Sequence, residues 1–291
     1  MKKLLYILIA VAALYTACGE EEEPINPNAG VPNAPGDSTT VGGSNDPDSG
    51  KTPADSTIAG GDDTPTETEE PSADARLEIY QKIYAASDIY IEGDFIIIKT
   101  NGRPDHKSPY YMETEWASEL HEEYDGDNDK FRLNPNRIGE FNYTFKIPLN
   151  PQEATRHQAT PMGAIGVAIN GVPFYNQYAA PDEPLTNEIN SFDQYNGHPT
   201  GNSNYHYHIE PLYLTESKGK DVLLGFLLDG FPVYGPTEDG KLVSDNDLDE
   251  YHGHTHTTSD YPDGIYHYHI TSNDPYINGN GYFGTPGTFS Q

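Results

Sequence analysis

The sequence predicts a mainly β protein: a single β-rich domain with long loops and one short N-terminal helix, built around an internal duplication. Three observations support this prediction. Short runs of β-branched and aromatic residues alternate with Gly, Pro, Asn and Asp across residues 76–291. Only residues 73–87 show a helical spacing of apolar side chains. Several blocks of the chain also occur twice, in the same order.

Residues 1–17 predict a lipoprotein signal peptide. They begin with two lysines, continue with an apolar run and end directly before Cys18. The run is too short for a membrane-spanning helix, and Tyr-Thr-Ala-Cys at residues 15–18 resembles a lipobox. We therefore expect an exported, palmitoylated protein, anchored to the bacterial envelope through Cys18. The expected place is the outer membrane, facing either the periplasm or the cell surface. An ordinary signal peptide followed by an unmodified Cys is the alternative.

Residues 18–75 predict an acidic, disordered tether. They are rich in Pro, Gly, Ser, Thr, Asp and Glu and contain almost no large apolar residue. Such a segment cannot bury enough surface to offset the loss of chain entropy. The whole chain has a formal net charge of −30 at pH 7, which argues against nucleic acid as a partner. The sequence names no protein partner.

The expected elements of the domain begin with the helix at residues 73–87, ADARLEIYQKIYAAS, for which Ser72 is a candidate N-cap. Strands are expected in five runs rich in β-branched and aromatic residues. These runs are DFIIIKT (94–100), EFNYTFKIPL (140–149), GAIGVAING (163–171), VLLGFLLDG (222–230) and IYHYHIT (265–271).

The duplication consists of three matched blocks. GVAINGVPFY (166–175) matches GFLLDGFPVY (225–234), FDQYNGHP (192–199) matches LDEYHGHT (248–255), and YHYHI occurs at 205–209 and 266–270. The half-units therefore span about 163–209 and 222–270. Because duplicated units commonly pack about a pseudo-two-fold axis, we expect the histidines of both halves to meet at one point between the repeats.

The repeated Tyr-His-Tyr-His segments suggest a transition-metal site. Side chains alternate between the two faces of a strand, so both histidines of a segment share one face. Each half adds a Gly-His pair, and imidazole suits Cu and Zn. A hydrogen-bonded or surface role for these histidines is the alternative. Six ligands exceed the four of a structural zinc site, so either two ions bind or some histidines orient others. The candidate ligands are His198, His206, His208, His254, His267 and His269.

Four further residues are weaker candidates. Asp229 lies in a Gly-Pro turn and could be a ligand or a base, although a turn explains it. Asp193 and Asp249 each precede a Gly-His histidine by five residues. They could accept an imidazole N–H or form turns. His256, like His252, has no counterpart in the first half and therefore ranks lower.

The two Tyr-His-Tyr-His blocks, DGFPVYGP (229–236), LDEYHGHTH (248–256) and YPDGIYHYHIT (261–271) resemble the YHYH-domain proteins of bacteria. IKTNGRPDHKSPYY (98–111), NPNRIGEF (134–141), IPLNP (147–151) and GVAINGVPFYN (166–176) resemble the same family's opening segments. The resemblance covers residues 90–287 and implies export, but it implies no settled activity. It adds His106 as a secondary site candidate. Relatives commonly carry Cys where this chain has Tyr195 and Tyr251, so Cys is excluded as a metal ligand here.

Three functions remain open at this stage. The first is a metal-binding surface lipoprotein. The second is a metal-dependent enzyme, a hydrolase or an oxidoreductase, whose substrate and catalytic residues the sequence does not identify. The third is a glycan- or peptide-binding surface module that uses some of the 22 tyrosines of the chain as stacking platforms.

Overall fold

The computed structural model describes residues 72–291. The predicted signal peptide, Cys18 and all but the last few residues of the predicted tether lie outside the described residues. No helix within 72–291 combines the length and apolar character that crossing a membrane requires.

The described residues form two main sheets, and the prediction of a mainly β domain is confirmed. A four-stranded antiparallel sheet contains β1 (Asp88–Glu92), β2 (Phe95–Thr100), β3 (Tyr143–Pro148) and β18 (Thr288–Ser290), in that order. The other sheet has eight strands in the order β15-β16-β12-β11-β5-β6-β10-β9. Its strands are β5 (Ala164–Ala168), β6 (Pro173–Tyr175), β9 (Gly197–Pro199), β10 (Tyr205–Tyr207), β11 (Leu223–Leu227), β12 (Pro232–Tyr234), β15 (Gly253–His256) and β16 (Ile265–His269).

Smaller elements connect the sheets. Three further strand pairs are β4 (Glu153–Gln158) with β17 (Tyr282–Gly284), β7 (Tyr178–Ala179) with β8 (Glu183–Pro184), and β13 (Thr237–Glu238) with β14 (Lys241–Leu242). The helices are α1 (Ala73–Tyr80), α2 (Ala117–Leu120) and α3 (Leu212–Lys218), with 3₁₀ turns η1 (Pro109–Tyr111), η2 (Glu188–Ser191) and η3 (Asp245–Asp247).

Helix α1 starts where the sequence predicts. Ser72 is its N-cap, and the Ser72 side chain accepts a hydrogen bond from the Ala75 backbone amide. The helix ends at Tyr80 rather than near residue 87. The next amides bond three residues back, from Lys82 to Ile79 and from Ile83 to Tyr80, which tightens the chain into turns. The buried Ile83 thereby enters the core although it lies outside the helix.

The eight-stranded sheet has an internal symmetry that follows the sequence repeat. From the centre of the sheet to one edge, the first half contributes β5, β6, β10 and β9. From the centre to the other edge, the second half contributes the equivalent strands β11, β12, β16 and β15. At the centre β5 pairs antiparallel with β11. Val167 lies opposite Phe226, and Gly166–Leu227 and Ala168–Gly225 flank this pair. A pseudo-two-fold axis through the Val167–Phe226 pair relates the two halves.

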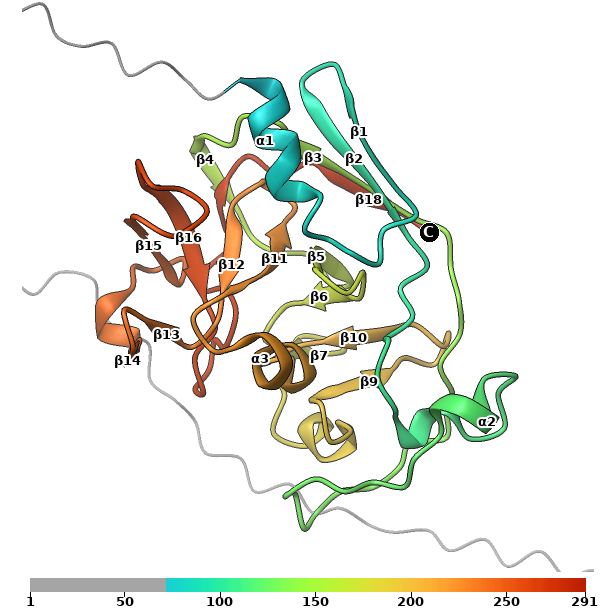
Figure 1. The fold of residues 1–291 in the computed structure, drawn as a ribbon. Helices are drawn as coiled ribbons and strands as arrows, with labels where there is room; N and C mark the ends of the chain where they lie inside the picture. Colours follow the sequence, from blue (N-terminus) through green and yellow to red (C-terminus); the bar gives the residue numbers. More distant parts are fainter. Residues whose placement is uncertain (1–71) are drawn as a thin grey trace, which may run out of the picture. The chain divides into compact units, whose positions relative to one another are not determined.

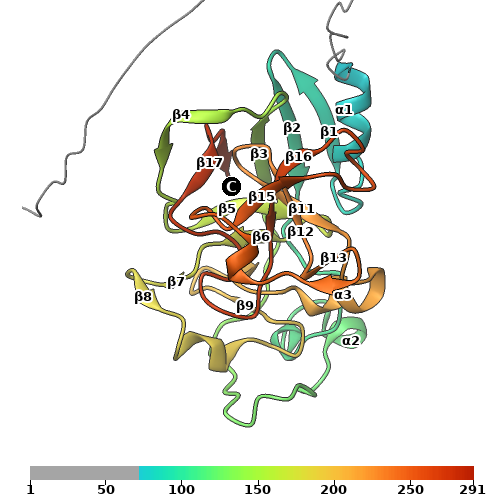
Figure 2. The ribbon, with the colours of Figure 1, turned by 90° about the vertical axis from the view of Figure 1, so that its left-hand side faces the viewer.

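This symmetry separates the histidine strands instead of joining them. The strands β10 and β16 are five inter-strand steps apart, or about 24 Å at the usual strand spacing. Figures 1 and 2 show β9 at one end of this sheet and β15 and β16 at the other. The expectation of one shared site between the repeats is therefore wrong. The axis passes through β5 and β11, so the YHYH strands lie toward the outer edges.

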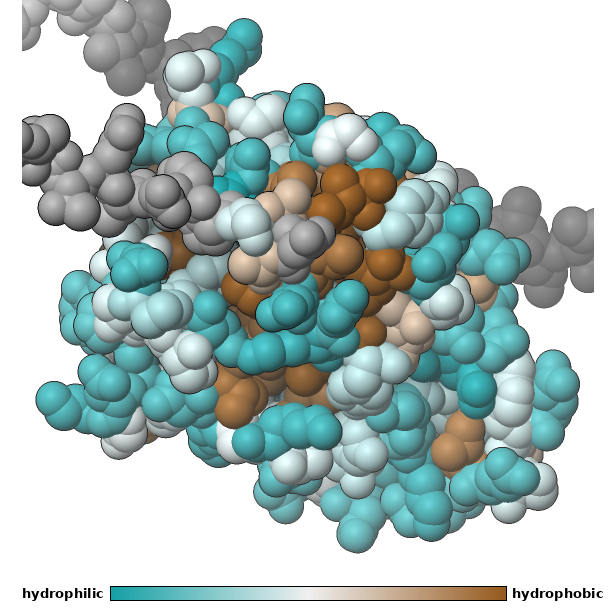
Figure 3. All heavy atoms as spheres, turned by 45° about the horizontal axis from the view of Figure 1, so that its top comes forward, coloured by the Kyte–Doolittle hydropathy of each residue, from teal (hydrophilic) through white to brown (hydrophobic). Residues whose placement is uncertain are grey.

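The core is unusually rich in tyrosine. On the face shown in Figure 3, hydrophilic side chains surround one central group of hydrophobic ones. Most large aromatic and aliphatic side chains are instead inside, between the sheets and around the YHYH strands. The buried tyrosines are Tyr80, Tyr110, Tyr111, Tyr143, Tyr205, Tyr207, Tyr234, Tyr266, Tyr268 and Tyr282.

Candidate metal centres

Each half of the domain forms a histidine hairpin from two adjacent strands. β9 pairs antiparallel with β10 and places His198 directly opposite His206. β15 pairs in the same way with β16 and places His254 opposite His267. Cross-strand neighbours have side chains on the same face, so the Gly-His and YHYH segments of one half act together.

A steric constraint requires glycine before the histidine in each Gly-His segment. A β-carbon on Gly197 would collide with the ring of Tyr205, and one on Gly253 with the ring of Tyr266. The first tyrosine of each YHYH segment therefore lies across the glycine of the partner strand. This contact explains why the histidine is preceded by Gly in both halves.

The N-terminal cluster consists of Glu188, His198, His206 and His208, whose candidate ligand atoms all lie within 4.8 Å of one another. The Nε2 atom of His206 is 3.2 Å from that of His198 and 2.9 Å from that of His208. The Glu188 carboxylate lies 3.1 Å from His198 Nε2. Three imidazoles and a carboxylate thus converge on one point.

Hydrogen bonds fix the tautomers of two of these histidines. His206 Nδ1 is 3.1 Å from the carbonyl oxygen of Asn204, and His208 Nδ1 is 2.5 Å from that of Asn176. A carbonyl oxygen only accepts, so each Nδ1 carries the proton. Both Nε2 atoms consequently present lone pairs toward each other.

His198 is not fixed in the same way. Its Nδ1 lies 2.8 Å from the Ser191 hydroxyl and 3.5 Å from the Asn134 side-chain amide. Its Nε2 lies 3.1 Å from the Glu188 carboxylate, which can accept a hydrogen bond from it. The His206 and His208 lone pairs, the Glu188 carboxylate and His198 Nε2 thus converge, and a metal cation could take the place of the His198 proton.

The surroundings keep these ligands in the form that binds metal. Burial, with the nearby His198 and His208, holds the pKa of His206 well below its usual range. Burial also lowers the pKa of His208 to about 4. Burial acts in the opposite direction on Glu188, but the hydrogen bond and charge of His198 prevail and lower the pKa of that carboxyl. Neutral imidazoles and an ionised carboxylate are what a metal site needs.

The C-terminal cluster consists of Glu238, His254, His267 and His269, again with all candidate ligand atoms within 4.8 Å. The Nε2 atoms of His267 and His269 are 3.1 Å apart. The Oε1 atom of Glu238 is 3.2 Å from His267 Nε2, 3.4 Å from His254 Nε2 and 3.7 Å from His269 Nε2. His256 Nδ1 also lies 3.0 Å from this oxygen.

The tautomers and pKa values of this cluster follow the same pattern. His267 Nδ1 faces the Ile265 carbonyl at 3.0 Å, and His269 Nδ1 faces the Gly235 carbonyl at 2.8 Å. Burial lowers the pKa of His267 to about 4 and lowers the pKa of His269 as well. The Nε2 atom of His254 is buried, and Glu238 Oε1 at 3.4 Å is its nearest polar contact. A buried nitrogen within 4.8 Å of two other imidazoles and a carboxylate is well placed to bind a cation.

The two clusters differ in how they are covered. In the N-terminal cluster the ring of Tyr175 stacks on His206, with centroids 3.9 Å apart, and Phe192 packs against His198 and His208. The His198 side chain is only 5% exposed. In the C-terminal cluster the His254 side chain is 24% exposed.

A cavity of about 310 Å³ also borders the C-terminal cluster. Glu238 and His269, both members of the cluster, are part of its wall.

The aspartates near the Gly-His segments serve tyrosines rather than imidazoles. Asp193 accepts a hydrogen bond from Tyr205 at 2.8 Å, and Asp249 accepts one from Tyr266 at 2.9 Å. Each aspartate also accepts two backbone amides of its own turn. Asp193 and Asp249 therefore form turns, as one of the two alternatives predicted, and do not accept an imidazole N–H.

Asp229 lies on the tyrosine face as well, away from both clusters. Its carboxylate accepts hydrogen bonds from Tyr268 at 2.6 Å and from the amides of Phe231 and Gly284. Burial is the largest influence and raises the pKa of Asp229 to about 6. The equivalent Asn170 contacts Tyr207 at 3.1 Å. These contacts assign Asp229 to the support of the YHYH strand.

The remaining candidates take different positions. His106 is buried against Tyr207, whose hydroxyl lies 3.1 Å from its Nε2, so it belongs to the tyrosine face. His256 lies beside the C-terminal cluster with a side chain that is 43% exposed. His252 is buried and contacts Thr271 instead. Tyr195 and Tyr251 pack on His106 and His157, with ring centroids 4.5 and 4.3 Å apart.

The sequence analysis missed both glutamates. Glu188 is the first residue of η2, whereas Glu238 lies in β13, so the two carboxylates come from different elements. They precede His198 and His254 by ten and sixteen residues. Because the two glutamates do not occupy equivalent positions in the repeat, aligning the two halves does not identify them. They reach the histidine clusters only because the loops that carry them pack onto the hairpins.

Comparison with known proteins places this domain. The family model described as YHYH protein matches residues 144–241 and 237–281. The segments at 98–111 and 134–141 lie outside the matched residues. Neither the curated proteins nor the solved structures contain a significant match to the chain. The matched residues include both histidine hairpins, and residues 144–281 therefore form a domain of the YHYH family.

Proposed function

We propose that this protein is an exported, lipid-anchored metal-binding protein that holds one Cu or Zn ion in each of its two histidine clusters. Of the two arrangements left open by the sequence, this is the one with two ions. Each cluster offers three imidazole nitrogens and one carboxylate oxygen, which is a complete four-ligand set for such metals.

The observation that carries the proposal is the orientation of the N-terminal histidines. The Nδ1 atoms of His206 and His208 donate to backbone carbonyls, so their Nε2 lone pairs face each other at 2.9 Å. Neutral imidazoles in that arrangement repel. Protonation would relieve the repulsion, but burial lowers the pKa of His206 and His208. A cation bound by both lone pairs would relieve the repulsion.

Elemental analysis of protein purified without chelators tests the proposal directly. We expect two Cu or Zn ions per chain, with anomalous diffraction locating one at each cluster. The variants H206A and H267A should each lose one ion. Metal-free protein that is unaffected by added Cu²⁺ or Zn²⁺, together with unchanged stability of both variants, would rule the function out.

The anchor is a proposal about residues that the structure does not describe. It rests on the lysines, the apolar run and the Tyr-Thr-Ala-Cys sequence that ends at Cys18. Mass spectrometry of protein from bacterial membranes should find a diacylated N-terminal Cys18. The variant C18S should lose the lipid and leave the membrane fraction. An intact N-terminal Met1 on the membrane-bound protein would contradict this processing.

The other two hypotheses receive unequal support. A metal-dependent enzyme gains support from the cavity beside the C-terminal cluster, because catalytic metal sites keep a position open. A glycan- or peptide-binding module needs exposed aromatic platforms, whereas ten tyrosines of the described domain are buried. We therefore keep the enzyme as the second candidate.

A further inference from the structure

We propose that the metal centre of the C-terminal cluster binds an exogenous small ligand, a neutral or cationic nitrogen or oxygen donor, in the adjoining cavity. The N-terminal centre, in this proposal, binds none. The inference rests on the proposed metal binding and deepens it, since it assigns ligand exchange to one of the two sites.

The cavity reaches the cluster itself. It has a volume of about 310 Å³, enough for a small molecule, and Glu238 and His269 form part of its wall. An ion held by these residues would therefore face the cavity. Copper readily takes a fifth ligand, and zinc expands from four to five ligands. A ligand in the cavity could thus join the metal without displacing a histidine.

The orientation of one tyrosine differs between the two halves, and in the C-terminal half this tyrosine lines the cavity. Tyr175 and Tyr234 occupy equivalent positions in the two half-units. Tyr175 stacks flat on His206, with ring centroids 3.9 Å apart and an angle of 26°. Tyr234 instead meets His267 edge-on, at 5.1 Å and 67°. The Tyr234 ring therefore does not lie on the face of the His267 imidazole, although His267 itself is buried.

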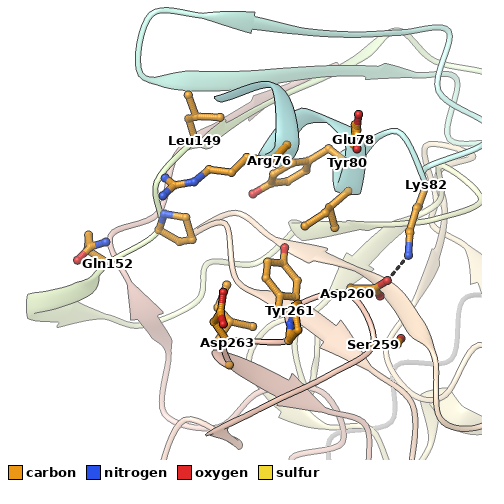
Figure 4. Close-up of a pocket in the computed structure, with 16 residues that line it drawn as sticks. Arg76, Glu78, Tyr80, Lys82, Leu149, Gln152, Ser259, Asp260, Tyr261 and Asp263 are labelled. Carbon is orange, nitrogen blue, oxygen red and sulfur yellow. Dashed lines mark hydrogen bonds and ion pairs between the residues drawn. The ribbon is translucent and has the colours of Figure 1, made fainter. Parts of the chain in front are cut away.

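Tyr234 is held in this orientation by hydrogen bonds on its far side. Its hydroxyl lies 2.8 Å from that of Thr258 and donates to Asp260 at 3.0 Å. Asp260 in turn pairs with Lys82, directly after α1. Figure 4 shows Lys82 and Asp260 pointing toward each other at the edge of a second, larger cavity. These contacts, from Lys82 through Asp260 to Tyr234, thus hold in place one wall of the cavity beside the C-terminal cluster.

The lining of the cavity selects the class of ligand. Acidic side chains from Asp221, Glu238 and Asp239 surround it, together with hydroxyl groups from Tyr234, Thr257, Thr258 and Ser259. Clustered negative charge repels anions, and the whole chain carries a net charge of −30. Neutral or cationic donors that can also accept or donate hydrogen bonds are favoured over phosphate or sulfate.

A spectroscopic titration of the full-length protein loaded with Co²⁺ tests the inference. Imidazole serves as the neutral probe and inorganic phosphate as the anionic one. We expect imidazole to change the visible absorption of one of the two bound Co²⁺ ions. Phosphate should bind at least about tenfold more weakly than imidazole. H267A should lose the C-terminal ion and with it the whole imidazole response. H206A should lose the N-terminal ion and keep the imidazole response.

The control variants separate this inference from the proposed function. H106A removes a buried histidine outside both clusters and should keep two ions and the response. H254A serves if H267A does not fold, because His254 is partly exposed. The double variant D221N/D239N should bring phosphate binding closer to imidazole binding by several-fold.

The outcomes are then distinct. Two bound ions with no imidazole response, or a response that survives loss of the C-terminal ion, would overturn the inference and leave metal binding standing. A phosphate affinity that equals the imidazole affinity would overturn the ligand class. Absence of Co²⁺ from both clusters would overturn the proposed function itself.

Discussion

The two histidine clusters have the same ligands but different covers. In both, a Gly-His strand faces a YHYH strand, three Nε2 atoms converge and a glutamate completes the set. Phe192 and a flat Tyr175 cover the N-terminal imidazoles. In the C-terminal half Leu248 replaces Phe192 at the equivalent position, and Tyr234 stands edge-on.

This difference separates what the repeated blocks determine from what the loops determine. Strand register alone places one imidazole opposite another, and both halves have that register. Access to the cluster depends on one difference within the blocks, Phe192 against Leu248, and on Thr258 and Asp260 between the blocks, which hold Tyr234 edge-on. A duplicated unit can therefore supply one buried centre that stabilises the fold and one accessible centre that exchanges ligands.

The largest expected effect comes from removing a ligand of the covered cluster. H206A should lower the free energy of unfolding by about 4 kcal/mol in metal-containing buffer, the stabilisation given by an ion at about a thousand times its dissociation constant. H267A should cost less, because the C-terminal cluster is more exposed to water, with 24% of the His254 side chain exposed against 5% of that of His198, and an ion there is expected to bind less tightly. Denaturant unfolding with and without metal measures both values.

The metal-free proteins supply the control for this experiment. Without a cation, His206 contributes facing lone pairs that repel, so H206A and the unsubstituted protein should differ by much less. The stability difference between H106A and the unsubstituted protein should be the same with and without metal, because His106 lies outside both clusters. If H206A were as costly in metal-free protein as in loaded protein, packing rather than metal would explain its effect.

Strand periodicity was enough to predict that the candidate histidines of each YHYH segment share one face. Alternation of side chains placed His206 and His208 on one face and the tyrosines on the other, and the structure has both faces as described. The location of the site could not be predicted in this way. Whether duplicated strands meet or diverge depends on which strands lie at the axis, and the order of a sheet is a long-range property.

Acidic residues were the hardest to assign from sequence. Asp193 and Asp249 stand at repeated positions and attracted attention, yet they bond to tyrosines and turn amides. Glu188 and Glu238 do not repeat, yet they reach the clusters. A carboxylate on a loop can face many partners, so its role follows from tertiary packing rather than from local spacing.

The next effect in size concerns pH and compares one histidine from each cluster. Burial lowers the pKa of His208 and of His267 to about 4. In the unfolded chain, imidazole takes up a proton below about pH 6.5, whereas these two stay neutral in the folded metal-free protein. Stability should therefore fall as the pH decreases from about 6.5 toward 4, by about 2 kcal/mol for each histidine by pH 5.

Unfolding of metal-free protein at several pH values checks this expectation. H208A and H267A should each remove a similar part of the slope between pH 6.5 and 5. A slope that is unchanged in H208A but abolished in H267A would mean that only the C-terminal cluster is buried enough to resist protonation. Bound metal should shift the loss of stability to lower pH, because the ion competes with protons for the same lone pairs.

The smallest effect compares the second tyrosine of each YHYH segment. Tyr268 donates to the buried carboxylate of Asp229 at 2.6 Å, whereas Tyr207 contacts the neutral amide of Asn170 at 3.1 Å. Hydrogen bonds to charged groups contribute more than neutral ones. Y268F should therefore cost about 2 kcal/mol and Y207F about 1 kcal/mol at pH 7, and neither should change the metal content.

The pH dependence of Y268F sharpens this comparison. Asp229 has a pKa of about 6, raised by burial above its ordinary value, so its charge costs stability as the pH rises through 6. Tyr268 offsets that cost by donating to the ionised form. The penalty of Y268F should therefore be largest above pH 6 and shrink toward pH 4, where Asp229 is protonated in both proteins. The Tyr207 hydroxyl contacts the Asn170 amide and His106 rather than a carboxylate, so the penalty of Y207F should not increase as Asp229 ionises. Equal pH profiles for the two variants would show that the Asp229 charge does not distinguish the two YHYH strands.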